Sequence, residues 1–294
     1  MSPASFAAEL AVASHCQLGE GPQWHAATGR LYWCDILGRR LHWLKPATGA
    51  TGHHDLDQMV SLAAPCEDGG LLLVGEHRLA RFDPKSGRTE GFCDFAADDP
   101  PTRGNDARVD RHGSLWFSRM GKGAEPGAGS LHRLHRGELT RLRTGLTIPN
   151  AICFSPGGEV AWFTDTPTGV VMRWALDREG WPVGEPTPWA DFSAHAGNPD
   201  GAVVDAEGQL WLALWGAGRV VRLDNDGRIV AEIILPVSQP SCPAFAGERL
   251  ERLYITSARE GLSEAELAGQ PLAGGLFVAE VGVAGLAERA SRTR

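Results

Sequence analysis

The stretch GEVAWFTD at residues 158–165 sets the architecture, because its pattern of a glycine turn and then an apolar, aromatic strand recurs along the chain. Six copies start 40, 44, 45, 50 and 43 residues apart, a spacing typical of four-stranded propeller blades. The other copies are GRLYWCD at 29–35, GGLLLVG at 69–75, GSLWFS at 113–118, GQLWLA at 208–213 and ERLYITS at 251–257. The repeat predicts an all-β fold, a six-bladed β-propeller, as a single domain over residues 1–294 with a metal site in its central channel.

A second strand phrase follows most copies and alternates apolar with polar residues, as in RLHWL at 40–44 and RVVRLD at 219–224. Such alternation is typical of strands that bury one face. We expect a first strand at roughly 9–16 and the last phrase, GLFVAE at 275–280, to meet in one blade and close the ring. The best short-helix candidate, EGLSEAELA at 260–268, is expected on a loop.

Composition limits the classes of protein. The chain has 294 residues, of which 43% are hydrophobic and 22% charged, so it can bury a core. A net charge of −8 without a basic patch argues against nucleic-acid and anionic-membrane partners, and no apolar run approaches the ~20 residues of a membrane span. Six cysteines allow three disulfides, but no Cys-x-x-Cys pair and no basic signal-peptide region occur, which favours reduced thiols in the cytoplasm. We expect a monomer.

Polar residues precede the glycine turns at a shared register. Asn105, Asn150 and Asp200 each lie eight residues before their turn glycine, and Glu20 lies nine residues before. These segments are the innermost strands of a propeller, so side chains at one height in different blades converge on the axis. Oxygens of two carboxylates and two amides suit a hard or borderline divalent cation. Taken singly, each is also a common turn residue that caps backbone groups.

Arg103 lies two residues before Asn105 and therefore faces the same side of a strand, where it would hold a substrate oxygen or an anion. A surface arginine in a loop is the alternative. Motifs of several other enzyme classes do not occur in the sequence: there is no His-Glu-x-x-His pair, Gly-x-Ser-x-Gly elbow, phosphate loop, dinucleotide fingerprint or EF-hand loop. A zinc protease and an α/β-hydrolase are therefore disfavoured.

In combination and order, several motifs resemble the senescence marker protein / gluconolactonase / regucalcin family of sugar lactonases over nearly the whole chain. They are LGEGPQW at 18–24, RGNDARVD at 103–110, IPNAICFSP at 148–156, NPDGAVVD at 198–205 and AGGLF at 273–277. The resemblance implies that Glu20, Asn150 and Asp200 ligate one divalent cation, which could be Ca, Zn, Mn, Mg or Fe(II). It also implies that Arg103 and Asn105 contact the lactone.

The resemblance further implies hydrolysis of an aldonolactone (gluconolactone, xylonolactone, arabinonolactone or similar) to the aldonic acid, a carboxylic ester hydrolase reaction. The cation would polarise the lactone carbonyl. We expect Asp200 to be the general base on water, or only a ligand if water held on the cation attacks directly. The family commonly brings an acidic lid residue to the substrate from the loop after Met120, where the nearest acid here is Glu125.

Three other classes of function stay open. One is a calcium-binding regulatory protein of the regucalcin type, and another is an organophosphate or other ester hydrolase on the same propeller. The third is a scaffold propeller that need not carry a channel cation. Metal content and turnover on lactones distinguish these classes.

Overall fold

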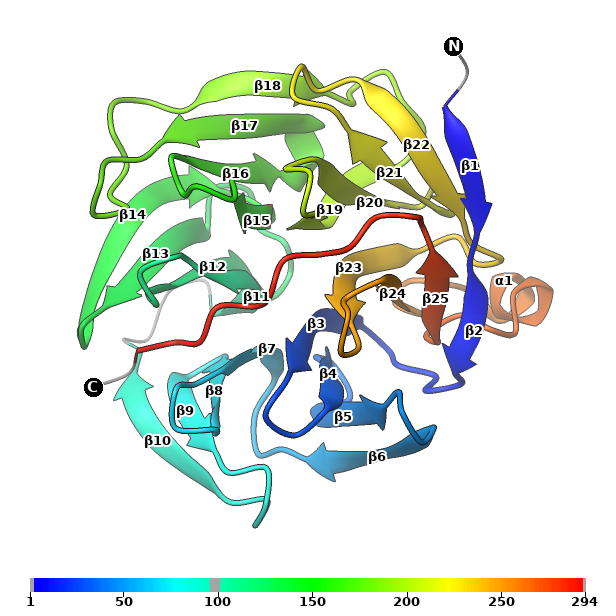
Figure 1. Ribbon diagram of the computed structural model, residues 1–294, viewed down its shortest axis with the longest axis horizontal. Helices are drawn as coiled ribbons and strands as arrows, with labels where there is room; N and C mark the ends of the chain where they lie inside the picture. Colours follow the sequence, from blue (N-terminus) through cyan, green and yellow to red (C-terminus); the bar gives the residue numbers. More distant parts are fainter. Residues whose placement is uncertain (1–2, 96–100, 293–294) are drawn as a thin grey trace.

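The structure, a computed structural model, describes residues 3–95 and 101–292 as six sheets around a central channel (Figure 1). The predicted all-β, six-bladed propeller is confirmed. Strands are given from the channel outwards. The first blade holds β3 (Gly19–His25), β4 (Arg30–Asp35), β5 (Arg40–Lys45) and β6 (Ala50–Asp55), and the second holds β7 (Val60–Pro65), β8 (Leu71–Gly75), β9 (Arg78–Phe82) and β10 (Thr89–Asp94). The third blade holds β11 (Thr102–Val109), β12 (Leu115–Gly121), β13 (Gly129–His135) and β14 (Glu138–Leu146). The fourth blade holds β15 (Pro149–Phe154), β16 (Val160–Asp165), β17 (Val170–Ala175) and β18 (Thr187–Asp191). The fifth holds β19 (Asn198–Val204), β20 (Leu210–Trp215), β21 (Arg219–Leu223), β22 (Ile229–Ile234) and β1 (Ala4–Ala7). The sixth holds β23 (Pro240–Ala246), β24 (Arg252–Ser257), β25 (Leu276–Glu280) and β2 (Glu9–Val12).

The innermost strands of the blades line the channel and are almost entirely buried. Each contacts the innermost strand of the next blade, and β23 contacts β3, so the ring is continuous. Apolar clusters fill the spaces between the faces of adjacent blades; Trp211, Phe245 and Phe277 belong to the cluster between the fifth and sixth blades. The apolar, aromatic strand phrases of the repeat therefore contribute to the core.

The first and last strands close the ring as predicted, since β2 pairs antiparallel with β25 in the sixth blade. The strand ends at Val12 rather than near residue 16, because the Ser14 N–H turns back to the Val12 carbonyl, 3.0 Å away. The Ser14 hydroxyl donates to the carbonyl of Gly274 at 2.8 Å. The strand β1 was not predicted; it adds a parallel fifth strand to β22 of the neighbouring blade. The N-terminal segment thus ties two blades together.

Helical structure is limited to two short elements among the described residues, η1 (Thr166–Thr168) and α1 (Glu264–Gly269). The helix α1 begins four residues later than the expected 260–268, because Ser263 and Glu266 form a capping box at its start. Neither helix has the length and apolar character needed to cross a membrane. All six cysteines are free thiols, and five of them are buried.

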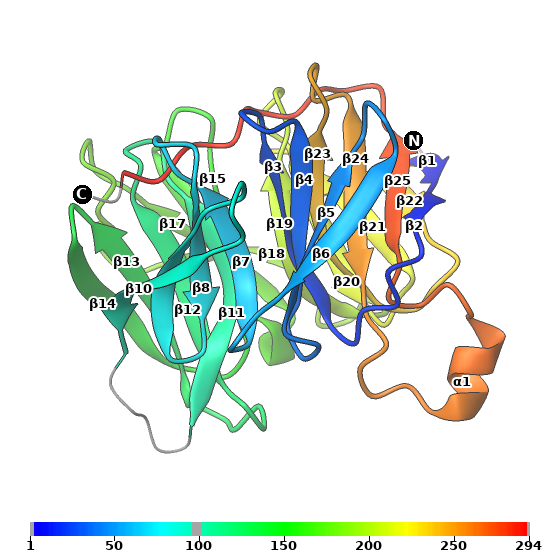
Figure 2. The ribbon, with the colours of Figure 1, turned by 90° about the horizontal axis from the view of Figure 1, so that it is seen from below.

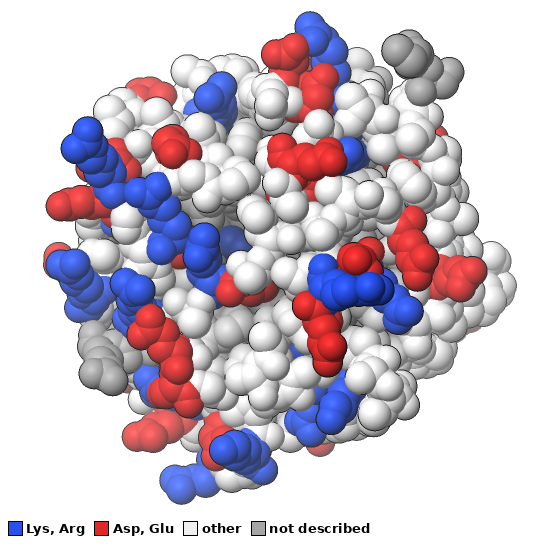
Figure 3. Space-filling view, in the orientation of Figure 1, with Lys and Arg blue, Asp and Glu red and all other residues white. Residues whose placement is uncertain are grey.

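Residues 281–292, here called the C-terminal strap, cross one face of the ring over the end of the channel (Figures 1 and 2). The Glu288 carboxylate accepts a hydrogen bond from the Arg108 guanidinium at 2.6 Å, and the same guanidinium donates to the Ala202 carbonyl at 2.7 Å. The strap also pairs with the second blade, where the Ser291 N–H donates to Pro65. With these contacts, the strap covers this end of the channel. Acidic and basic side chains are interspersed on this face of the molecule (Figure 3).

Candidate functional site

The other end of the channel, on the side from which α1 projects (Figure 2), holds a cavity of about 460 Å³. Five of the six residues that the sequence predicted as ligands or substrate contacts line it: Glu20, Arg103, Asn105, Asn150 and Asp200. They come from four blades and lie up to 180 residues apart in the chain. The shared register thus brings them together in space.

Irregular pairing aims these side chains into the channel. The ladder of each of the four innermost strands shifts register at the site: after Glu20 in β3, after Gly104 in β11, after Asn150 in β15 and after Pro199 in β19. A β-bulge turns the side chain beside it out of the regular alternation. Each blade therefore repeats one local device, which explains why the sequence register could find these positions.

A chain of hydrogen bonds links the polar side chains across three blades. The Arg103 guanidinium donates to Asn105 Oδ1 at 2.8 Å, and Asn105 Nδ2 donates to Asn150 Oδ1 at 2.8 Å. Asn150 Nδ2 donates in turn to the Thr166 hydroxyl at 3.0 Å, which donates to the Pro199 carbonyl at 2.8 Å. The chain fixes both amides, so that their orientation is set before any ligand binds.

The two carboxylates of the cavity are both buried, with Glu20 8% and Asp200 5% exposed. Burial raises the pKa of Glu20 to about 8, and the nearby charge of Asp106 contributes. Burial and the charge of Glu20 raise the pKa of Asp200 well above its usual range. Two buried carboxylates beside an amide oxygen form a donor set that fits a divalent cation, since a cation would remove the cost of ionising both acids.

A third buried acid, Asp106, lies behind the cavity and does not line it. Its carboxylate accepts the N–H of Ile152 at 2.6 Å and the N–H of Ala107 at 2.8 Å, so it ties the third blade to the fourth directly behind Asn150. Burial raises its pKa to about 6. Asp106 is therefore an inter-blade hydrogen-bonding residue.

Glu125, expected as a lid contact, is not among the residues that line the cavity. Its carboxylate turns back onto its own loop and accepts the Gly123 N–H at 3.1 Å, and the tight turn at Gly121 leaves it packed there. Lys122, Gly123 and Ala124 of the same loop do line the cavity. The loop therefore reaches the site, but through Lys122 rather than through the acid.

Several residues that line the cavity were not predicted from the sequence, among them Lys122, Thr166, Trp215 and Glu260. Lys122 is ion-paired with Glu76 at 3.0 Å. Glu260 belongs to the segment expected to be helical, but it lies before the helix and its N–H is held by the Gln17 carbonyl at 2.9 Å. These residues lie at strand ends or just after them and carry no register signal, so only the folded chain reveals them.

Glycine at position 21 is required by the bulge that aims Glu20. Gly21 and Ala151 follow the two ligand candidates Glu20 and Asn150 with nearly the same backbone angle, φ 55° and 56°. A Cβ on Gly21 would overlap the Ser61 carbonyl of the next blade. The chain itself carries a buried alanine with this backbone angle at position 151. We expect Gly21→Ala to lower the free energy of unfolding by about 2–3 kcal/mol, through left-handed strain and overlap.

Urea unfolding measures that loss, and Ala151→Gly is the matched control. We expect the control to change stability by less than about 1 kcal/mol, because it relieves strain but removes a buried methyl group. Equal effects of the two substitutions would show that the overlap with Ser61 is unimportant.

Fold and site together define a six-bladed propeller with a buried, acidic and amide-lined cavity in its channel. The SMP-30/gluconolactonase/LRE-like region matches residues 18–259, and the chain belongs to this family. It is 40% identical over 279 residues to the L-arabinolactonase of Azospirillum brasilense, covering 92% of this chain and 90% of that one. It is 36% identical over 273 residues to the 6-deoxy-6-sulfogluconolactonase of Pseudomonas putida, covering 92% and 94%.

Among solved structures, this chain is similar to a calcium-binding protein, regucalcin, from Agrobacterium tumefaciens strain C58. The TM-score is 0.96 at 37% sequence identity, and the match covers 99% of this chain and all of that one. The similarity extends over the whole propeller and includes the blades that carry the cavity.

Proposed function

We propose that this chain is a single propeller domain that hydrolyses a sugar lactone to the sugar acid in the channel cavity, with a divalent cation bound by Glu20, Asn150 and Asp200. The observation that carries the proposal is the convergence of two buried carboxylates and a fixed amide oxygen beside Arg103 and Asn105. The two lactonase relatives support the same reaction class.

A divalent cation bound there would polarise the lactone carbonyl as a Lewis acid. Asp200 would take a proton from the attacking water as the water oxygen bonds to the carbonyl carbon. The bond from that carbon to the ring oxygen then breaks, and the same carboxyl returns the proton to the leaving alcohol oxygen. The bound cation would keep Asp200 ionised, which is the form that accepts a proton.

Arg103 and Asn105 would orient the lactone rather than make or break bonds. Arg103 is 6% exposed and Asn105 9% exposed, and both belong to the hydrogen-bond chain described above, so their positions are fixed. Polar side chains held in place in this way lower the entropic cost of positioning a ring hydroxyl. The cavity of about 460 Å³ has room for a monosaccharide-sized ligand.

A proton-release assay across a panel of five- and six-membered aldonolactones tests the proposal. We expect turnover of at least one sugar lactone, loss of turnover after chelation, and recovery when Ca²⁺, Mg²⁺, Mn²⁺, Zn²⁺ or Fe²⁺ is added back. Turnover that survives chelation would remove the cation from the proposal. Inactivity on every lactone with every cation would remove the reaction.

A calcium-binding role without catalysis is the second candidate, because the similar Agrobacterium protein is described as a calcium-binding protein. The same three ligands would serve it. Calorimetric Ca²⁺ binding that Asp200→Asn abolishes, in a protein with no lactonase activity, would favour this role. The cytoplasm as location and a monomeric state belong to the proposal and are open to fractionation and light scattering.

Arg103→Ala is expected to raise KM about tenfold to hundredfold while kcat changes much less. The guanidinium would hold the lactone before and during reaction, and a hydrogen bond to a charged group contributes about 1.5–3 kcal/mol. Steady-state kinetics on the preferred lactone measure the split, with Arg103→Lys as the charge-retaining control of intermediate effect. An unchanged KM with a large fall in kcat would instead assign Arg103 to transition-state stabilisation.

A further inference from the structure

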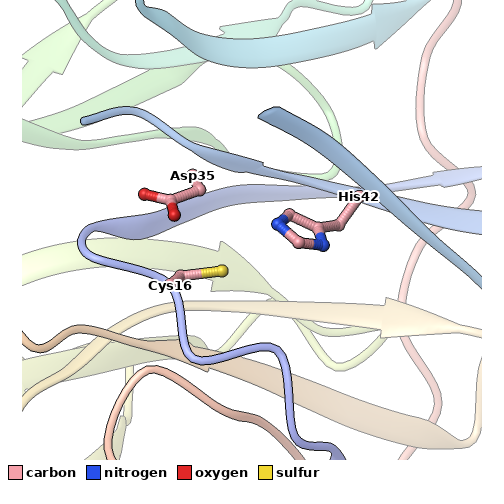
Figure 4. Close-up of side chains that lie close together, drawn as sticks. All are labelled: Cys16, Asp35 and His42. Carbon is pink, nitrogen blue, oxygen red and sulfur yellow. The ribbon is translucent and has the colours of Figure 1, made fainter. Parts of the chain in front are cut away.

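A second group of metal-ligating side chains lies outside the channel cavity, in the first blade. Cys16 precedes β3, Asp35 ends β4 and His42 lies in β5; none of the three lines the cavity. Their possible ligand atoms all lie within 4.8 Å of one another. Figure 4 shows the Cys16 sulfur and one edge of the His42 ring turned toward the same space beside Asp35. We call this group the blade-one cluster.

His42 offers a buried, neutral imidazole that is suited to bind a metal. Its side chain is 9% exposed, and its Nε2 is buried and makes no hydrogen bond to any described residue. The ring is held in place by stacking on Trp33, with 5.2 Å between the ring centroids and 15° between the planes. Burial lowers the pKa of His42 to about 4, so the imidazole is neutral at physiological pH, the form that binds metals.

Asp35 is positioned by the backbone and keeps a free acceptor site. Its Oδ1 accepts the N–H groups of Leu18 and Gly38, each at 3.0 Å, and within the described part of the chain its Oδ2 accepts only the N–H of Gln17, at 3.1 Å. A lone pair of Oδ2 therefore stays free. Backbone hydrogen bonds that orient a carboxylate in this way are typical of the outer shell of metal sites.

Cys16 supplies the soft ligand. The thiol is fully buried and forms no disulfide, and burial with the charge of Asp35 raises its pKa to about 12. The thiol is thus protonated until a cation displaces the proton. Sulfur, imidazole nitrogen and one carboxylate oxygen are ligands that zinc-like cations prefer, whereas the three ligands proposed in the channel cavity all bind through oxygen.

We propose that the blade-one cluster binds a thiophilic divalent cation of the zinc class, independently of the channel site and of the proposed reaction. On binding, the Cys16 S–H bond breaks, the sulfur–metal bond forms and the proton leaves to solvent. Thiolate and carboxylate then balance the two positive charges. Tetrahedral zinc ligands lie about 3.3–3.8 Å apart, so the cluster must contract by at most about 1–1.5 Å from its widest separation.

The cluster is linked to the channel site through Asp35. The Gln17 and Leu18 N–H groups that Asp35 holds lie just before Gly19 and Glu20, and Leu18 lines the cavity. A cation in the cluster would therefore hold in place the segment that carries Glu20. This makes it a structural site, with thermal stability as its readout.

Cobalt(II) titration of the cation-free protein tests the proposal, because a thiolate ligand gives an intense sulfur-to-cobalt charge-transfer band that oxygen ligands do not give. We expect one equivalent of the band in the wild-type chain and in Asp200→Asn, whose channel site is disabled. Cys16→Ser and His42→Ala should weaken or lose it, and Cys34→Ala, which removes another buried thiol of this blade, should keep it. Zn²⁺ should raise the Tm of Asp200→Asn and not that of the Cys16→Ser/Asp200→Asn double variant.

The wild-type spectrum alone can overturn the proposal: without a charge-transfer band, the cluster does not bind the cation through sulfur. A band that persists in Cys16→Ser, or that disappears only in Cys34→Ala, would assign the thiolate to another residue. Should Cys16→Ser fail to fold, His42→Ala decides. An unchanged band and an unchanged Zn²⁺-induced rise in Tm in that variant would also overturn the assignment.

Discussion

Asp200→Asn is expected to lower kcat/KM for the preferred lactone by about a thousandfold or more. The substitution removes a ligand of the proposed cation and the proposed general base together, and a general base alone contributes a factor of about 10²–10⁴. Steady-state proton release and calorimetric titration with the activating cation measure the two losses. Rates near those of the wild type would remove Asp200 from the catalytic role.

The same variant carries its own control for folding. The pKa of Asp200 is raised in the folded protein, so the folded chain holds a proton that the unfolded chain has lost. The cation-free protein therefore loses stability as pH rises above the ordinary range of an aspartate, and the raised pKa of Glu20 extends this loss to about pH 8. With chelator present, we expect the Tm of Asp200→Asn to fall less with rising pH than that of the wild type. If Asp200→Asn is inactive but more stable than the cation-free wild type at about pH 8, its loss of activity cannot be due to misfolding.

The repeat made the propeller predictable from sequence, because each blade buries the same faces and so repeats the same apolar pattern. The register of Asn105, Asn150 and Asp200 made the channel residues predictable for the same reason: each follows one local device, the bulge of an innermost strand. A side chain whose position depends on the repeat can be found by counting residues back from the turn glycine of its blade. Glu20, one residue out of register, reaches the same cavity.

Features outside the repeat could not be counted in this way. Trp215, the last residue of β20, and Glu260, which follows β24, both line the cavity, and nothing in the sequence shows that their side chains face it. Glu125 has the residue type expected of a lid contact, but the tight turn of its glycine-rich loop directs its carboxylate to Gly123. The blade-one cluster was missed because Cys16, Asp35 and His42 have no metal-ligand spacing, and only the pairing of β4 with β5 brings the last two together.

The strap has no repeat signal either, and its main contact joins residues 180 positions apart. The Arg108 and Glu288 side chains are 8% and 11% exposed, so neither charge is well solvated. Removing one partner of such a pair leaves the other charge buried, which typically costs about 3–5 kcal/mol. An apolar replacement of both partners costs much less, since no charge is left behind.

We therefore expect Arg108→Met to lower the free energy of unfolding by about 3 kcal/mol, and Arg108→Met/Glu288→Met to recover most of it. Urea unfolding of both single variants and the double variant gives the coupling energy. The strap offers an internal control, since the exposed pair of Arg292 and Glu67, 65% and 56% exposed, should contribute less than about 1 kcal/mol. If Arg108→Met were no more damaging than Arg292→Met, the strap would be a surface segment rather than part of the core. A loss confined to faster hydrogen exchange over residues 281–292 would instead mean that the strap detaches and Glu288 regains water, while the six blades stay folded.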